Sequence, residues 1–162
     1  MKLIITDLED FNLSVEGEYK IIKPDNFPKN CIGCFGCWNR TPGVCVIHDG
    51  YEYTGAKIGK CDEMIIIGRC YCGSVSPFIK MVQDRAISYV SPDFEIREGE
   101  MHHKHRYYNK FSLSAYMYGE DITKKEKETL RNSLKANCLN YDSTLGEIKF
   151  YENAEKLEGI VL

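Results

Sequence analysis

Four cysteines lie within fifteen residues of the chain, and they are its strongest candidates for chemistry. Two residues lie between Cys31 and Cys34 and two between Cys34 and Cys37, while seven residues lie between Cys37 and Cys45. Thiolates at two-residue gaps, on a loop that contains glycines, can direct their sulfurs to one centre, as a [4Fe–4S] cluster requires. We therefore expect these four side chains to hold such a cluster.

Other uses of the same sulfurs compete with a cluster. Zinc also accepts four thiolates, but its usual sequence pattern is two separated pairs, whereas here three cysteines are crowded together. Disulfides are disfavoured because the chain begins Met-Lys-Leu-Ile-Ile-Thr, without a basic, apolar and cleavable leader, which predicts a cytoplasmic protein with reduced thiols. Zinc and inert free thiols stay open as alternatives.

The composition predicts one globular domain over residues 1–162. Of these residues 43% are hydrophobic, enough for a substantial core. The formal charge of −3 provides no general field that would attract nucleic acid or an anionic membrane. The longest apolar run, Met64 to Gly68, is far shorter than the roughly 20 residues of a membrane span. We expect no nucleic acid and no membrane among the partners.

Short apolar runs and two helix starts predict the elements that position the cysteines. Ser76 followed by Pro77 is a helix start, and that helix should end near Val90. Thr123-Lys-Lys-Glu126 is a capping box that opens a second, charged helix. Runs rich in β-branched and aromatic residues predict strands at 3–6, 19–22, 64–67, 111–118 and 147–151.

This order of elements predicts an α/β sandwich with a mainly parallel sheet and helices on both of its faces. Only twelve residues, 7–18, separate the first two strands, so the first crossover helix should be shortened or absent. Its loss would uncover one sheet face near the first strand, and we therefore expect a homo-oligomer. The sequence leaves open whether the tail, 152–162, docks on the domain or on a second copy.

Several motifs, taken in order, carry a resemblance to a known family. These are the cysteine run from Cys31 to Cys45, Ile47-His-Asp49, Asp62 to Gly68, Tyr71-Cys-Gly-Ser74, Ser76 to Lys80 and Asp84-Arg85. Together they resemble the flavodoxin-like NAD(P)H-dependent FMN reductases, and the compact cysteine run is most similar to the iron–sulfur flavoproteins. The resemblance implies a flavodoxin-like three-layer sandwich with FMN at the C-terminal ends of the strands, where the strand order reverses.

The resemblance also implies which residues contact FMN, and it shows two departures. The flavin loop would be Gly68, Arg69, Cys70, Tyr71, Cys72, Gly73 and Ser74, with Arg69 in a place where the family has proline. Family members have a small-residue phosphate loop after the first strand, whereas this chain has Asp7-Leu-Glu-Asp-Phe-Asn12. Its carboxylates would repel a phosphate, and its bulky side chains would obstruct the approach of the backbone.

Three histidines, His102, His103 and His105, lie in a region that the resemblance places in a loop near the flavin. They could bind a metal or move a proton, although solvated histidines are commoner in loops. Our leading hypothesis is a redox protein that passes electrons between the [4Fe–4S] cluster and FMN, with NAD(P)H or a redox partner protein at the other end. The alternative is a degenerate flavodoxin-like protein without FMN that is structural, zinc-binding or partner-binding.

Overall fold

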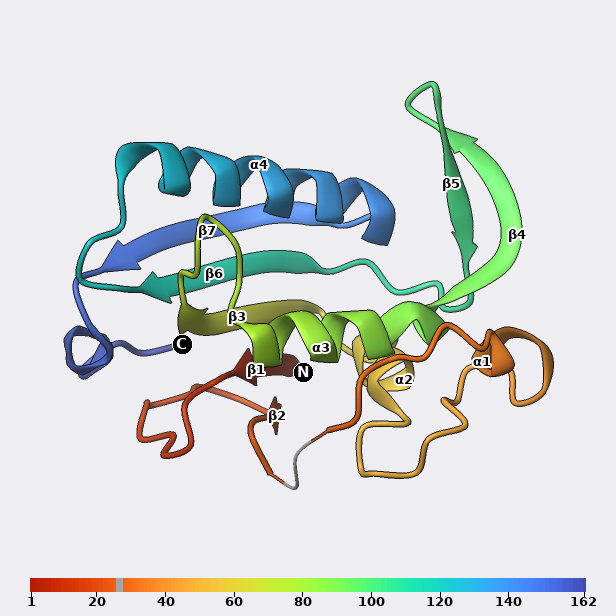
Figure 1. The fold of residues 1–162 in the computed structure, drawn as a ribbon, viewed down its shortest axis with the longest axis horizontal. Coiled ribbons are helices and arrows are strands. Elements are labelled where there is room, and N and C mark those ends of the chain that lie inside the picture. The colour runs from red at the N-terminus through yellow and green to blue at the C-terminus, as the bar shows by residue number, and fades with distance from the viewer. Residues whose placement is uncertain (26–27) are drawn as a thin grey trace.

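A five-stranded parallel sheet forms the centre of the computed structural model, which describes residues 1–25 and 28–162 (Figure 1). Its strands lie side by side in the order β2-β1-β3-β6-β7, and every neighbouring pair is parallel. The order reverses between β1 and β3, since the chain first adds β2 on one side and then the later strands on the other. The strands are β1 (Lys2–Thr6), β2 (Tyr19–Ile22), β3 (Glu63–Arg69), β6 (Ser112–Tyr118) and β7 (Thr144–Tyr151).

The continuous apolar runs predicted to be strands are buried on both faces of this sheet. In β1 and β3 the side chains from Leu3 to Ile5 and from Met64 to Ile67 are at most 1% exposed. Side chains alternate between faces along a strand, so an unbroken apolar run fits a strand that is covered on both sides. The expected α/β class and parallel sheet are confirmed.

The helices pack on one face of the sheet. Helix α3 (Pro77–Arg85) continues as a 3₁₀ turn (Ala86–Tyr89), and α4 (Lys124–Tyr141) begins at the predicted capping box, where Thr123 and Glu126 bond reciprocally. Two short helices, α1 (Gly36–Asn39) and α2 (Thr54–Ile58), lie in the long connection between β2 and β3. The buried side chains of α2, α3 and α4 form one apolar core with those of the sheet.

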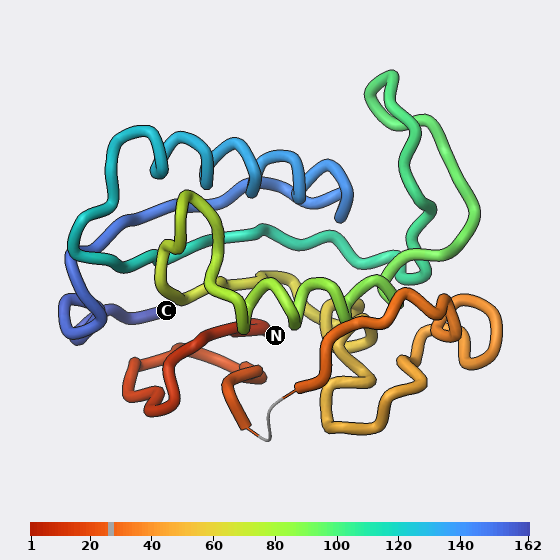
Figure 2. The backbone as a smooth tube through the Cα atoms, viewed as in Figure 1, coloured from red at the N-terminus to blue at the C-terminus, as the bar shows by residue number. Residues whose placement is uncertain are grey.

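We predicted helices on both faces of the sheet, but the opposite face is covered by irregular chain and one 3₁₀ turn (Ala154–Leu157). Residues 7–18 form no helix, as the short spacing predicted, and they pack with the C-terminal tail over Ile4, Ile65 and Ile67. The tail is held there by backbone hydrogen bonds between Leu162 and residues 14 and 16 (Figure 2). The tail thus docks on its own domain, and this face, which we expected a second copy to cover, is already covered by the chain itself.

An antiparallel hairpin extends from the amino-terminal edge of the sheet (Figure 1). It consists of β4 (Val90–Arg97) and β5 (Glu100–His105), with a turn at Glu98 and Gly99 where both residues have positive φ. The resemblance implied that the three histidines lie in a loop near the flavin edge. This is wrong, because they lie in β5, between the end of α3 and the start of β6.

No helix in the described residues combines the length and apolar character needed to cross a lipid bilayer.

Candidate functional site

The four cysteines predicted to hold a cluster line one small, largely apolar hollow beside the end of α3. Cys31 and Cys34 are exposed at its rim, whereas Cys37 and Cys45 are buried. The wall behind them includes Arg85, the last residue of α3, whose side chain is fully buried. The fold therefore brings together all four sulfurs that the spacing selected. No disulfide joins them, and all eight cysteines of the chain are free.

Residues 31–45 form a loop, which we call the cysteine loop. Tight backbone turns allow this loop to close around the hollow. Gly33 and Phe35 both have positive φ, at 64° and 54°, and α1 starts immediately afterwards. A Cβ atom at Gly36 would lie 2.5 Å from Val46 and 3.5 Å from the sulfur of Cys34. A side chain at position 36 would thus displace Val46, so glycine allows the two arms of the loop to approach each other.

The sulfurs are close enough to influence one another's ionisation. Burial raises the pKa of the Cys37 thiol, and the nearby sulfurs of Cys45, Cys31 and Cys34 raise it further. Among the described residues, however, no three His, Cys, Asp or Glu side chains converge on a single metal ion. A cubane cluster is wider than one ion, and each thiolate binds a different iron atom. Both a cluster and zinc stay open as occupants of this hollow.

Arg85 joins the two ends of the cysteine loop. Its guanidinium donates to the backbone carbonyl of Lys29 at 2.8 Å, before the first cysteine, and to that of Ile47 at 2.9 Å, after the last. It also donates to both carboxylate oxygens of Asp49, at 2.7 and 3.0 Å. One buried side chain thus holds the loop closed at its base. The resemblance included Asp84-Arg85 but gave Arg85 no role.

The chemistry of this arginine fits a thiolate-bound cluster. Burial lowers the pKa of Arg85, but its bonds to Asp49 and the proximity of the Cys45 sulfur outweigh this and raise it, so the group stays charged. Its Nε is buried and has no hydrogen-bond partner among the residues the structure describes. A spare N–H donor and a positive charge beside Cys45 would stabilise a negatively charged sulfur centre.

The predicted flavin loop, Gly68–Ser74, closes on itself. Tyr71 and Ser74 exchange backbone hydrogen bonds of 2.8 and 2.9 Å, and Cys72 and Gly73 between them have positive φ. This is the pattern of a tight hairpin turn. The backbone N–H groups of Tyr71 and Ser74 are therefore used inside the loop and are not free to bond a flavin.

Asp7 lies at the reversal point between β1 and β3, where the resemblance implies FMN. Its carboxylate accepts the backbone N–H of Arg69 at 2.9 Å and the hydroxyl of Tyr118 at 3.0 Å. The N–H of Cys70 is bonded to the carbonyl of Tyr118. A Cβ atom at Gly68 would lie 2.2 Å from Ile79, which shows how closely this edge is packed. As it stands, this edge does not fit a flavin phosphate or ring.

The cysteine hollow and the flavin loop lie at opposite ends of α3. The loop precedes Pro77, the first residue of the helix, whereas Arg85 and Ile87 border the hollow. The nine residues of α3 span about 14 Å. The sequence did not reveal this separation, because it depends on the direction in which α3 crosses the sheet.

The three histidines do not form a common site. His102 is buried with its Nδ1 3.2 Å from the side-chain oxygen of Asn140, and His105 lies 3.2 Å from the backbone carbonyl of the same residue. Burial lowers the pKa of His105. The ring of His103 packs 4.8 Å from that of Trp38, which follows the third cysteine. These contacts attach the hairpin to α4 and to the cysteine loop.

No family model matches the chain, and no curated protein is significantly similar to it. The assignment of function therefore depends on the geometry of the site and on the resemblance drawn from the motifs.

Proposed function

We propose that the protein is an electron-transfer protein that carries a [4Fe–4S] cluster on a flavodoxin-like fold. The observation that carries this proposal is the single hollow lined by Cys31, Cys34, Cys37 and Cys45. When bound, such a cluster takes up and releases one electron at a time. With the hairpin set aside, the parallel strands follow the order 2-1-3-4-5, which is the flavodoxin order.

The residues around the hollow would have different roles in such a site. Cys37 and Cys45 would bind the buried side of the cluster, and Cys31 and Cys34 the exposed side. Arg85 would hold the loop closed and supply positive charge next to Cys45. Because the rim is exposed, a redox partner protein can approach it without opening the fold.

An anaerobic metal analysis tests the proposal. The protein is purified and reconstituted with iron and sulfide without oxygen, and its iron, sulfide, zinc and visible absorption are measured. We expect close to four iron and four sulfide per chain, from the composition of the cluster. Zinc alone, or a colourless protein without metal, would instead support a structural or partner-binding role.

Two cysteine variants test whether iron is bound by the four proposed ligands or by other cysteines of the chain. Cys34→Ala should abolish iron binding, because it removes one of four ligands. Cys72→Ala is the matched control, since Cys72 is also exposed but lies in the turn before α3. Equal iron content in the two variants would refute the ligand assignment.

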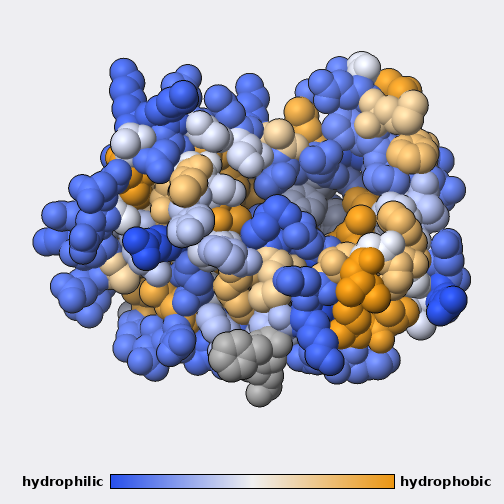
Figure 3. All heavy atoms as spheres, in the orientation of Figure 1, coloured by the Kyte–Doolittle hydropathy of each residue, from blue (hydrophilic) through white to orange (hydrophobic). Residues whose placement is uncertain are grey.

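We also propose that the protein forms a homo-oligomer, on a surface different from the one the sequence indicated. Phe94, Ile96 and Met101 of the hairpin are 56–70% exposed, and Ile32 and Phe35 of the cysteine loop are exposed too (Figure 3). A two-stranded hairpin is marginally stable by itself in water. Association of two copies through the hairpins would cover these apolar side chains.

A further inference from the structure

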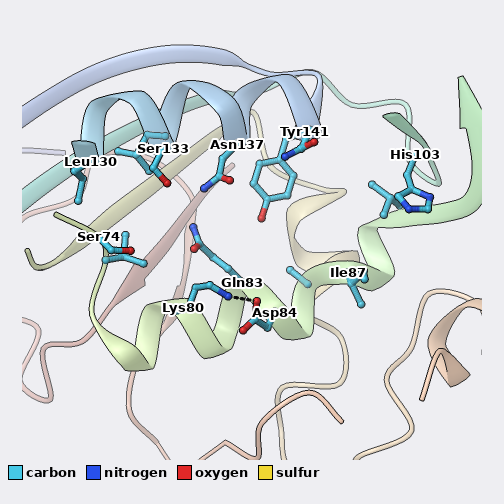
Figure 4. A pocket seen from close by; sticks show the side chains of 15 residues that line it. Ser74, Lys80, Gln83, Asp84, Ile87, His103, Leu130, Ser133, Asn137 and Tyr141 are labelled. Carbon is cyan, nitrogen blue, oxygen red and sulfur yellow. Dashed lines mark hydrogen bonds and ion pairs between the residues drawn. The ribbon is translucent and has the colours of Figure 1, made fainter. Parts of the chain in front are cut away.

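A cleft of about 410 Å³ lies between α3 and α4, on the helix-covered side of the sheet (Figures 3 and 4). It extends from Ser74, before α3, to His103 in the hairpin. Small-molecule sites in proteins usually measure roughly 300–1,000 Å³. The cleft therefore has the size of a ligand site, and neither the cysteines nor the flavin loop accounts for it.

Both walls of the cleft present uncharged polar side chains to its interior. Gln83 extends from α3, while Ser133, Asn137 and Tyr141 extend from α4 toward it (Figure 4). The amide nitrogen of Gln83 is buried and has no partner among the described residues, and the same is true of Nδ1 of His103. Buried polar atoms are nearly always hydrogen-bonded, so the amide of Gln83, which reaches into the cleft, indicates a missing partner there.

The remaining lining is apolar or electrically neutral. Val75, Ile87, Leu130 and Leu134 supply apolar surface. The ionic side chains of the cleft wall, Lys80 and Asp84, pair with each other one helical turn apart, as the dashed line in Figure 4 marks. Within the part of the chain that the structure describes, the cleft wall offers a charged ligand no free opposite charge, whereas a flat, uncharged ligand could contact apolar side chains with its faces.

We propose that this cleft binds an uncharged planar heterocycle with C=O and N–H groups on one edge. A carboxamide has a donor and an acceptor side by side and can pair with such an edge through two hydrogen bonds. Gln83 and Asn137, on opposite walls, are the residues that would do so. This chemistry is shared by uracil, guanine and the isoalloxazine ring of flavins.

This cleft differs from an ordinary FMN site in its position and, within residues 1–25 and 28–162, in its lack of a phosphate-binding group. The strand edge where FMN was expected is occupied by the carboxylate of Asp7. Among the described residues that line the cleft, the ammonium group is that of Lys80, and it is already paired with Asp84. A phosphate would therefore add no affinity, and riboflavin should bind at least as tightly as FMN.

Binding titrations with four probes test the proposal. Riboflavin and FMN are followed by the quenching of their fluorescence, and uridine and guanosine by calorimetry. Saturable one-to-one binding of riboflavin or of a nucleoside supports the proposal and identifies the source of the ring. The absence of saturable binding for all four probes overturns it. FMN binding ten times tighter than riboflavin also overturns it, since that result requires a phosphate site.

Two asparagines of α4 provide a matched pair of variants. Asn137→Ala should weaken binding about tenfold, the effect of losing one good hydrogen bond. Asn132→Ala is the control, because Asn132 is on the same helix and exposed, and it does not line the cleft. Both variants replace an asparagine of α4 with alanine, so they raise the helix propensity by the same amount. Equal affinity in the two variants would overturn the assignment of Asn137.

A larger side chain separates a binding defect from a folding defect. Asn137→Phe should fill part of the cleft and abolish binding while the protein keeps its helical circular dichroism. Cys34 does not line the cleft, so Cys34→Ala protein should bind the probe as the wild type does. Failure of the cluster proposal would thus leave this test unaffected.

Discussion

The guanidinium of Arg85 and the carboxylate of Asp49 form a two-point ion pair in which the side chains are 0% and 7% exposed. The arginine ends helix α3, and the aspartate follows the cysteine loop. Together they attach that loop to the body of the domain. The geometry of the proposed metal centre therefore depends on a contact between residues that are thirty-six positions apart in the chain.

Arg85→Met should destabilise the protein by about 3–5 kcal/mol, because it leaves the buried carboxylate of Asp49 without its counterion. The loop should also open, and the reconstituted protein should lose iron faster. Urea unfolding and the rate of iron release to a chelator measure the two effects. Arg40→Met, at an exposed position of the same loop, should change neither. Unchanged iron release in Arg85→Met would refute the positioning role.

The same pair predicts an acid transition. Burial raises the pKa of Asp49, but hydrogen bonds from Arg85 and from the N–H groups of Lys29 and Tyr51 outweigh it and lower this pKa from 3.8 to about 2. A carboxylate with a lowered pKa stabilises the fold above the unfolded value and loses this contribution as the pH falls.

We therefore expect about 2 kcal/mol of stability to disappear between pH 4 and pH 2, relative to Asp49→Asn. Urea unfolding of both proteins at several pH values measures the difference. The stability of the variant should vary less with pH over this window. Parallel pH profiles for the two proteins would show that Asp49 does not titrate as its contacts predict.

Gln83→Leu should raise the stability of the ligand-free protein by about 1 kcal/mol, because the buried amide nitrogen at this position has no partner. Thermal unfolding measures the change. Asn132→Leu, on the exposed side of α4, is the control for adding a leucine to a helix. A lower melting temperature for Gln83→Leu would mean that the amide makes stabilising bonds in the free protein.

Ile96→Lys should weaken self-association at least tenfold, since it places a charge among the exposed apolar side chains of the hairpin. Sedimentation velocity over a range of concentrations measures this. Glu98→Lys introduces the same residue at the hairpin turn and should have a smaller effect. A wild-type protein that stays monomeric at every concentration would contradict the proposed assembly.

Local patterns in the sequence were enough to predict the elements of the sheet and its main helices. The β-branched runs of β1 and β3, the proline at the start of α3 and the capping box of α4 act through neighbouring residues, so each could be recognised without the fold. The cysteine spacing likewise predicted which thiols would lie together, because a fifteen-residue loop limits how far they can separate.

Only the tertiary structure decided what surrounds those elements. The contact of Arg85 with Asp49, the carboxylate of Asp7 at the strand edge and the cleft between Gln83 and Asn137 all join segments that are distant in sequence. Such contacts depend on the direction in which each helix crosses the sheet and on how side chains pack, and neither has a local sequence signal. The hairpin was missed for a related reason: its strands pack outside the main sheet and lack the continuous apolar runs of buried strands.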